Sequence, residues 1–344
     1  MGAEPTGAHA RDYAESVRDH ARRRALFAGG LHIAGLGEQP GESVEQAIEE
    51  AERRIMAIAE DTVADTSCTA PELVADVFDR IEAQAQGRGR RGIPTGLASL
   101  DNLLGGLRAG ELVVVAARPG VGKTALCVQI AGCAAIKEEL PVRLVSLEQS
   151  HSEIGDRLHS LMASVDGSKL RDGSLSADET QRLYQAGSRV RESALVVDDA
   201  PCQTVLRIAA TARRMKRRQG LALLVVDYLQ FVEPDSRREP RHEQVSTISR
   251  RLKALARELE VPILAAAQLN REAENGRKPR LSDLRESGGI EADADVVMLL
   301  HRDDVSRGIN VDVAKHRNGP MGEIALNYIP AFTRFEDPIA GSGF

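Results

Sequence analysis

The first part of the chain carries apolar residues at helical spacing. Between residues 8 and 86 apolar positions recur every three or four residues, apart from a turn-like stretch at 37–41, and this period predicts amphipathic helices. Ser43 and Thr69 each precede an apolar stripe and have Gln or Glu three residues later, which predicts a helix cap at each position. The stripes are Val44, Ile48, Ala51, Ile55 and Ile58, and Leu73, Val74, Val77, Phe78 and Ile81. Each stripe requires an apolar partner surface, either in this chain or on a neighbouring copy.

Beyond residue 92 short apolar runs alternate with amphipathic helices. The runs are rich in β-branched residues and lack polar alternation, a pattern typical of central strands in a parallel sheet that is covered on both faces. Candidate strands are 112–116, 143–146, 195–197, 223–226, 263–266 and 296–300. The sequence therefore predicts an α/β fold with a central, mostly parallel sheet.

Composition changes along the chain suggest four segments. We expect a helical N-terminal region at 1–62, a linker helix with a flexible Gly/Arg-rich linker at 63–92, a large α/β domain at 93–337 and a tail at 338–344. The segment after residue 92 is long enough to bury a large core of its own.

Charge and aromatic content limit how the chain can bind nucleic acid. The net charge is -6 and aromatic residues make up 3% of the sequence, without Trp, so neither bulk positive charge nor base stacking provides a binding surface. The basic run at 213–218 is interpreted as a solvated helix face. Any DNA contact must therefore be local.

Cysteine usage and hydropathy indicate the compartment. The four cysteines lack paired metal-ligand spacing, and the chain shows neither a secretory signal nor an apolar run long enough to span a membrane. We expect a cytoplasmic protein without a membrane partner.

Segment 111–124 reads as strand, glycine-containing loop and helix. Ala117, Gly122, Lys123 and Thr124 fit the phosphate-loop pattern, with Ala in place of its first Gly. Backbone N–H groups around Gly120 and Gly122 can wrap phosphates, Lys123 can reach the outer phosphates, and the Thr124 hydroxyl can bind Mg²⁺. The cofactors expected are ATP and Mg²⁺. The residues expected to bind them in this loop are Arg118, Pro119, Gly120, Val121, Gly122, Lys123, Thr124 and Ala125.

Three polar residues follow candidate strands at the edge where ligands bind in open α/β sheets. Asp227 ends an apolar run and is interpreted as a magnesium ligand together with Thr124, the alternative being a strand-end cap. Glu148 is the candidate general base, the alternative being a helix N-terminal Glu. Gln268 is placed to sense the γ-phosphate and to signal to 269–271.

Six short motifs follow one another in a fixed order. They occupy 117–124, 146–150, 226–230, 268–271, 283–288 and 315–319. Together they resemble the motifs of the DnaB-type replicative helicases, over residues 92–335. The resemblance implies a RecA-like P-loop ATPase fold and a hexameric ring around single-stranded DNA. It also implies ATP bound between neighbours and translocation from 5′ to 3′.

The resemblance assigns further residues to sites. Lys315 and Arg317 would lie on a hairpin that reaches the next subunit's nucleotide, with Arg317 as an arginine finger, while Arg285, Glu286 and Gly288 would hold the DNA backbone. Considered without the family, Lys315 and Arg317 share one side of a strand as exposed charge, and the DNA segment is a polar loop.

The chain departs from the family pattern in three places. Gly120 and Val121 replace a Ser-Met pair, Gln149 replaces a Met, and 13–60 matches only the last N-terminal helix and the linker helix. We therefore expect a remnant of the N-terminal domain, which makes primase a doubtful partner and leaves a helicase loader as a candidate.

Two rival functions accompany the helicase hypothesis. A RecA-fold assembly or helicase-loading factor would bind ATP and DNA without unwinding. A recombinase is disfavoured by the matches at 285–288 and 315–317.

Overall fold

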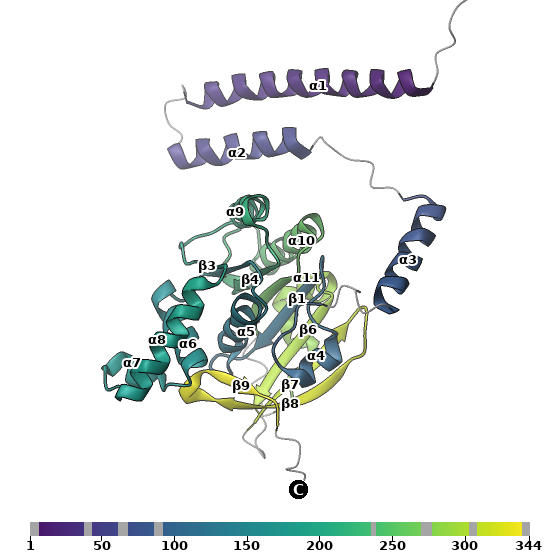
Figure 1. The fold of residues 1–344 in the computed structure, drawn as a ribbon. Coiled ribbons are helices and arrows are strands. Elements are labelled where there is room, and N and C mark those ends of the chain that lie inside the picture. The colour runs from purple at the N-terminus through teal and green to yellow at the C-terminus, as the bar shows by residue number, and fades with distance from the viewer. Residues whose placement is uncertain are drawn as a thin grey trace, which may run out of the picture. The chain divides into compact units, whose positions relative to one another are not determined.

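A computed structural model describes residues 7–37, 43–60, 68–85, 92–234, 239–269, 277–302 and 308–338. Contacts divide the chain into two compact units, Met1–Gly89 and Arg90–Phe344. The first unit contains helices α1 (Gly7–Leu36), α2 (Val44–Glu60) and α3 (Ala70–Ala85), and α1 packs alongside α2 (Figure 1).

Helices α2 and α3 begin where the caps were predicted. Gln46 N donates to Ser43 Oγ at 3.2 Å and Ser43 N donates to Gln46 Oε1 at 3.4 Å, while Thr69 N donates to the Glu72 carboxylate at 2.8 Å. Large apolar side chains on α2 and α3 nevertheless stay more than half exposed. These are Val44, Ile48, Ile55, Leu73, Phe78 and Ile81. Packing within this unit therefore does not cover the two stripes.

A nine-stranded sheet forms the second unit, in the order β3-β2-β4-β5-β1-β6-β7-β8-β9. The strands are β1 (Leu112–Ala117), β2 (Val142–Ser146), β3 (Leu195–Asp198), β4 (Leu223–Asp227), β5 (Ile263–Gln268), β6 (Val296–Arg302), β7 (Ile309–His316), β8 (Gly322–Ile329) and β9 (Arg334–Glu336). The first six in spatial order are parallel and the last three pair antiparallel. The predicted α/β fold with a mostly parallel sheet is confirmed, and each predicted strand is present.

Two expectations about the sheet were wrong. β3 was expected to be central, but it lies at the sheet edge and its residues are half-buried. The antiparallel strands β7 to β9 were not among the candidate strands, apart from the strand and hairpin expected around Lys315, because β7 alternates buried and half-buried positions instead of forming a continuous apolar run.

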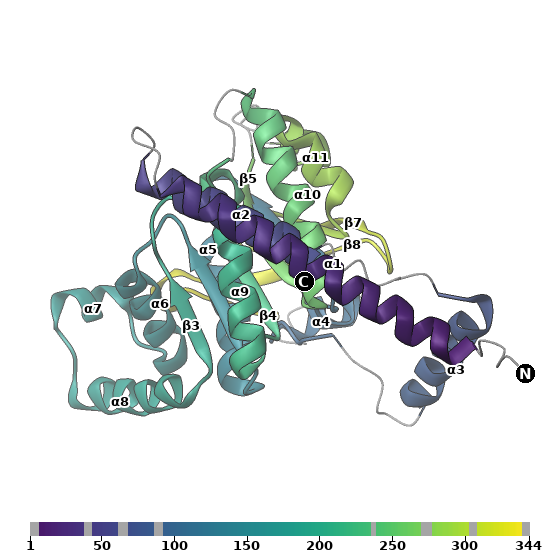
Figure 2. The ribbon, with the colours of Figure 1, turned by 90° about the horizontal axis from the view of Figure 1, so that it is seen from above.

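Helices cover both faces of the sheet (Figures 1 and 2). Val113 and Val115 of β1 point into a core shared with α4, α5 and α6, while Val114 and Ala116 point into a core shared with α9, α10 and α11. The helical elements are α4 (Ala98–Leu104), α5 (Lys123–Gly132) with its π-helical continuation η1 (Cys133–Lys137), α6 (His151–Ala163), α7 (Gly167–Asp172), α8 (Ala177–Glu192), α9 (Val205–Gln219), η2 (Leu229–Phe231), α10 (Arg241–Leu259), η4 (Leu281–Ser287), α11 (Gly288–Asp293) and η5 (Pro330–Phe332).

The basic run on α9 is partly structural. Arg213 makes two bonds of 2.7 Å to the Glu258 carboxylate, and Lys216 donates to the carbonyl of Leu259 at the end of α10. The expectation of a fully solvated face was therefore wrong for these two residues, although Arg217 and Arg218 are exposed.

The phosphate-loop helix α5 holds the last strand through one buried amide. Gln129 Nε2 donates to Phe335 O at 2.8 Å, and Phe335 N donates to Gln129 Oε1 at 2.7 Å. The Phe335 ring in turn lies against the phosphate loop, since a β-carbon added at Gly122 would sit 2.9 Å from it. β9 therefore supports the loop at which the nucleotide is expected.

Replacing Gln129 by Leu should reduce the free energy of unfolding by about 2–4 kcal/mol, because two buried backbone groups of Phe335 would lose their partners. Urea denaturation followed by circular dichroism would measure the change. The matched control is Gln181→Leu on the exposed face of α8, which should change stability by less than about 0.5 kcal/mol. Equal midpoints for the two variants would contradict the role of Gln129.

Candidate nucleotide site

The phosphate loop connects β1 to α5 through two glycines with positive φ. Gly120 has φ 75° and Gly122 has φ 114°, backbone conformations that favour glycine. Gly122 caps α5, so that Lys123 and Thr124 occupy its first turn. Backbone N–H groups at such a helix start lack intrahelical partners and are suited to bind phosphate.

A cleft of about 340 Å³ opens beside this loop, a volume within the range of small-molecule sites. Its lining includes residues predicted to bind nucleotide or take part in hydrolysis, namely Arg118, Pro119, Gly120, Gly122, Lys123, Thr124, Ala125, Glu148 and Gln268. Three unpredicted residues, Gln149, Arg157 and Tyr328, also line it. The Val121 side chain packs into the core instead of lining the cleft, so binding of nucleotide by Val121 stays a prediction that concerns its backbone.

Lys123 lies in the cleft over an aromatic ring. Its Nζ is 3.9 Å from the ring centroid of Tyr228, the residue after β4. Burial lowers the pKa of Lys123, while the nearby Asp227 carboxylate acts in the opposite direction. The ring and the carboxylate therefore hold the ammonium group near the carboxyl end of β4.

Asp227 ends β4 as a buried carboxylate, 2% exposed. Burial raises its pKa, and the nearby Thr124 hydroxyl and Lys123 ammonium oppose this rise. Neither carboxylate oxygen makes a hydrogen bond of normal geometry within the described residues, so the strand-end cap considered as the alternative does not form. A buried carboxylate beside a hydroxyl fits a hydrated Mg²⁺ ion, which prefers oxygen ligands and keeps several waters.

Glu148 is exposed and lines the same cleft. It precedes by two residues the N-cap of α6, Ser150, whose partner in the capping box is Glu153. Glu153 is therefore the helix N-terminal Glu that was considered as the alternative role for Glu148, and Glu148 itself lines the cleft. The preceding residue fixes the position, since Leu147 N donates to Asp227 O at 2.8 Å.

Gln268 ends β5 at the cleft, and Gln230 holds its backbone. Gln230 Nε2 donates to Gln268 O and Gln268 N donates to Gln230 Oε1, each at 3.2 Å. This pairing connects the turn after β4 to the end of β5, a role that the sequence did not reveal. Residues 270 and 271, to which Gln268 was expected to signal, lie outside the described residues.

The far wall of the cleft comes from the antiparallel strands. Tyr328 on β8 packs against Phe335 on β9 with ring centroids 4.6 Å apart. Burial raises the pKa of Tyr328, and the guanidinium groups of Arg157 and Arg302 oppose this. Arg302 also donates to Gly120 O at 3.1 Å. No local motif marks these residues, because they come from distant parts of the chain.

Lys315 and Arg317 do not line the cleft. Both donate to the carbonyl of Ala292 at the end of α11, and Arg317 also lies 3.4 Å from Asp295 Oδ1. Burial is the main cause of a lowered pKa at Lys315. Their common partner, Ala292 O, agrees with the expectation that they share one side. Arg317 is exposed, as the alternative of surface charge expected, while Lys315 is half-buried, and a helix C-terminus binds both cations.

The predicted DNA loop is described in its backbone alone. Arg285 and Glu286 belong to η4, and Gly288 begins α11, but their side chains lie outside the described part of the structure. Their contact with DNA stays a prediction.

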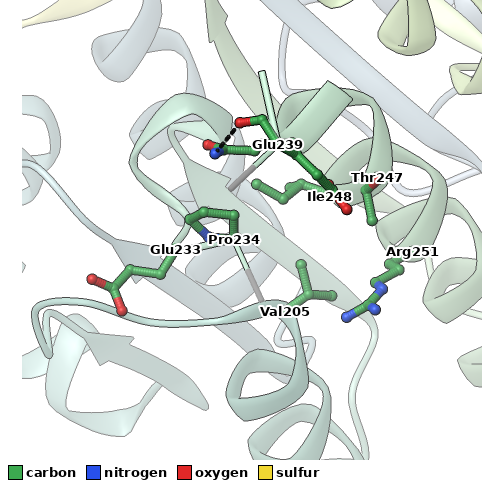
Figure 3. Close-up of a pocket in the computed structure, with 8 residues that line it drawn as sticks. Val205, Glu233, Pro234, Glu239, Thr247, Ile248 and Arg251 are labelled. Carbon is green, nitrogen blue, oxygen red and sulfur yellow. Dashed lines mark hydrogen bonds between the residues drawn. The ribbon is translucent and has the colours of Figure 1, made fainter. Parts of the chain in front are cut away.

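A second hollow, of about 70 Å³, lies between α9, α10 and the chain after η2 (Figure 3). Val205, Pro234 and Ile248 form its apolar side, and Gln244 Nε2 donates to Glu239 O at 2.8 Å beside it. Its volume is too small for a nucleotide, and none of the residues predicted to bind nucleotide lines it.

None of the described helices combines the length and apolar character that crossing a bilayer requires. Within the same residues, no three His, Cys, Asp or Glu side chains cluster as a metal site would require.

The sequence was compared with known families and curated proteins. Residues 92–337 match the family described as DnaB-like helicase C terminal domain. The Replicative DNA helicase DnaB of Leifsonia xyli subsp. xyli is 39% identical over 343 residues, covering 97% of this chain and 75% of that relative. The protein of the same name from Geobacillus stearothermophilus is 36% identical over 344 residues, covering 97% of this chain and 76% of its own length.

Solved structures agree with this similarity. The ATPase domain of G40P superposes with a TM-score of 0.74 at 32% identity, over 79% of this chain and 99% of that one. A DnaB-like replicative helicase, described with its interactions with primase, gives a TM-score of 0.79 at 29% identity, over 95% of this chain and 79% of that one. The chain therefore belongs to the DnaB-like helicase family and is an ATP-hydrolysing replicative DNA helicase with a RecA-like fold.

Proposed function

We propose that this helicase works as a hexameric ring that moves from 5′ to 3′ on single-stranded DNA and hydrolyses ATP between neighbouring subunits. The observation that carries the proposal is the division of the catalytic residues. Lys123, Glu148 and Gln268 line one cleft, while Lys315 and Arg317 are held at the end of α11 and do not line it. A complete site then requires a second copy of the chain.

Within the cleft, each residue has a distinct task. The phosphate loop binds the phosphates through its N–H groups, and Lys123 contributes positive charge to the outer phosphates. Thr124 and Asp227 would hold Mg²⁺, which supplies charge neutralisation when bound. Glu148 would orient the attacking water and accept its proton, and Gln268 would contact the γ-phosphate.

The apolar faces of α2 and α3 support assembly. Phe78, 63% exposed, and Leu73, 58% exposed, belong to the same stripe of α3. Exposed apolar stripes of this kind are typical of protein interaction sites. We propose that α3 docks on a neighbouring subunit, which leaves intramolecular packing as the less favoured alternative.

We propose that the segment from the end of η4 to the start of α11 contacts DNA, through Arg285, Glu286 and the backbone at Gly288. Contacts to phosphates do not depend on sequence, as a motor that moves along any DNA requires. The net charge of -6 agrees with a contact restricted to such a segment.

The loading-factor alternative differs in one observable property. Such a protein would bind DNA with ATP and leave the duplex intact. The curated relatives described above carry the name replicative DNA helicase, which favours unwinding.

Strand displacement on forked DNA tests the proposal. We expect ATP-dependent unwinding of forks with a free 5′ tail and no unwinding when the tail is 3′, with a hexamer as the active species by light scattering. Unwinding from the 3′ tail would contradict the proposed direction. Hydrolysis and DNA binding without displacement would instead support the loading-factor alternative.

Glu148→Gln should lower kcat for ATP hydrolysis by about 10²-fold with little change in nucleotide affinity, because the amide keeps the shape but cannot accept a proton. Steady-state phosphate release and binding of a fluorescent ATP analogue would separate the two effects. Glu153→Gln, at the α6 cap, is the matched control and should leave kcat within about twofold. If Glu148→Gln also kept kcat within twofold, Glu148 would not be the general base.

A further inference from the structure

Three buried acceptor oxygens at the nucleotide site make no hydrogen bond of normal geometry within the described residues. Two belong to the Asp227 carboxylate, and the third is Gln149 Oε1. Gln149 follows the candidate general base Glu148, and both residues line the cleft. Leaving a buried acceptor unpaired costs about 1–3 kcal/mol, so three of them at one site indicate a donor that binds there.

Backbone bonds fix the segment that carries Gln149 beside Asp227. Ser146 is paired with Asp227 in the register of β2 and β4, and Leu147 N donates to Asp227 O at 2.8 Å. Ser146 Oγ then donates to Gln149 O at 2.6 Å, which closes the turn. The side chain of Gln149 therefore starts from a fixed point at the ends of two adjacent strands.

The chemistry of the nucleotide limits what the donor can be. Triphosphate oxygens are acceptors, so they cannot satisfy an amide oxygen. Tyr328 provides the aromatic wall of the cleft. It lies on β8, which is near the opposite edge of the sheet from β2. Lys123 Nζ lies over the Tyr228 ring, and Gln149 Oε1 has no partner in the described chain. Water held with the phosphates can supply the missing donor.

We propose that the side-chain amide of Gln149 accepts a hydrogen bond from a water of the Mg²⁺–ATP complex and is a positioning residue for this site. The inference rests on the proposed function, since it requires that the cleft bind Mg²⁺–ATP. The water is either a ligand of the metal or the attacking water beside Glu148. In both cases Gln149 acts on a water molecule and makes no contact with the phosphates themselves.

Two substitutions separate an acceptor from a space-filling side chain. Gln149→Met keeps the length and volume of the side chain but removes the acceptor, whereas Gln149→Glu keeps an acceptor at the same reach. Gln181→Met on the exposed face of α8 is the matched control. Thermal melting of each variant checks that the fold is retained.

Binding of a fluorescent, non-hydrolysable ATP analogue would be measured with the full chain across a Mg²⁺ titration and without metal. We expect Gln149→Met to raise the Mg²⁺ concentration at half-saturation about 10-fold, as loss of an outer-shell partner does at other metal sites. Metal-free affinity should stay within about twofold, and Gln149→Glu should not show the rise.

Single-turnover hydrolysis at saturating Mg²⁺ identifies the water. A 10-fold slower step in Gln149→Met, with unchanged Mg²⁺ dependence and recovery in Gln149→Glu, would assign the bond to the attacking water and support the proposal. Unchanged binding and hydrolysis in Gln149→Met would overturn it, as would equal losses with and without metal. Lys123→Ala tests whether the cleft binds nucleotide at all. If this variant bound the analogue as tightly as the wild type, the proposed function itself would be contradicted.

Discussion

Replacing Lys123 by Ala should lower kcat for ATP hydrolysis by about 10³-fold, because the cleft loses the ammonium group that stabilises charge on the outer phosphates. The effect should be large because Lys123 lies in a desolvated position, where burial already lowers its pKa and where charge interactions are stronger than in water. Nucleotide affinity should fall as well, since the charge acts on bound ATP and on the transition state. Phosphate release under saturating DNA would measure kcat.

The control for this change must separate catalysis from folding. Lys123→Ala also removes the contact with Tyr228, in which Nζ is 3.9 Å from the ring centroid, so circular dichroism should confirm an intact fold. Lys137→Ala, an exposed lysine of η1, should leave kcat unchanged. Turnover of the Lys123 variant above about a tenth of wild type would mean that the phosphate loop has been assigned to the wrong residues.

The parallel part of the sheet could be predicted because its strands are buried on both faces. Runs such as 223–226 are continuously apolar for this reason. β7 packs mainly one face, so its sequence alternates Ile309, Val311 and Val313 with more exposed residues, and the search for apolar runs did not detect it. The edge position of β3 is likewise a property of the assembled sheet that no single segment encodes.

Some residues of the candidate site could be predicted from the sequence and others could not. Lys123 and Thr124 belong to one local motif, and Asp227 and Glu148 each follow a recognisable strand, so spacing was enough to select them. Tyr328, by contrast, reaches the cleft from β8, and the sequence gives no local sign of that approach. The segment boundaries, the DNA-binding side chains and the doubtful status of primase as a partner stay predictions.

Gln129 and Gln230 support the site although neither side chain takes part in the reaction. Gln129 fixes β9, whose Phe335 ring lies against Gly122, and Gln230 fixes the backbone of Gln268. Both act through paired backbone groups, so their effect depends on contacts between segments distant in sequence. A motif search detects the catalytic groups and misses these supports.

Arg317→Ala should lower kcat by about 10³- to 10⁵-fold, the range expected for loss of an arginine finger, with ATP affinity nearly unchanged. The reason is geometric: Arg317 is held against Ala292 and Asp295 and does not line the cleft of its own chain, so its charge would act on a neighbour. Arg317→Lys is the matched variant, because it can still bond to the carbonyl of Ala292 but lacks the planar fork. The Arg317→Lys variant should keep the C-terminal end of α11 stable, but its ATP hydrolysis should stay slow.

Mixed rings decide whether Arg317 acts on a neighbouring subunit. Arg317→Ala subunits have an intact cleft and Lys123→Ala subunits have an intact finger, so neither variant alone should hydrolyse ATP. Co-expressed under different tags and purified together, they should regain activity, because a Lys123→Ala subunit can present Arg317 to the cleft of its Arg317→Ala neighbour. A finger that acted within its own chain would leave such rings inactive, because no subunit would contain both groups. Recovery of hydrolysis would therefore place the two halves of the catalytic site on different copies of the chain.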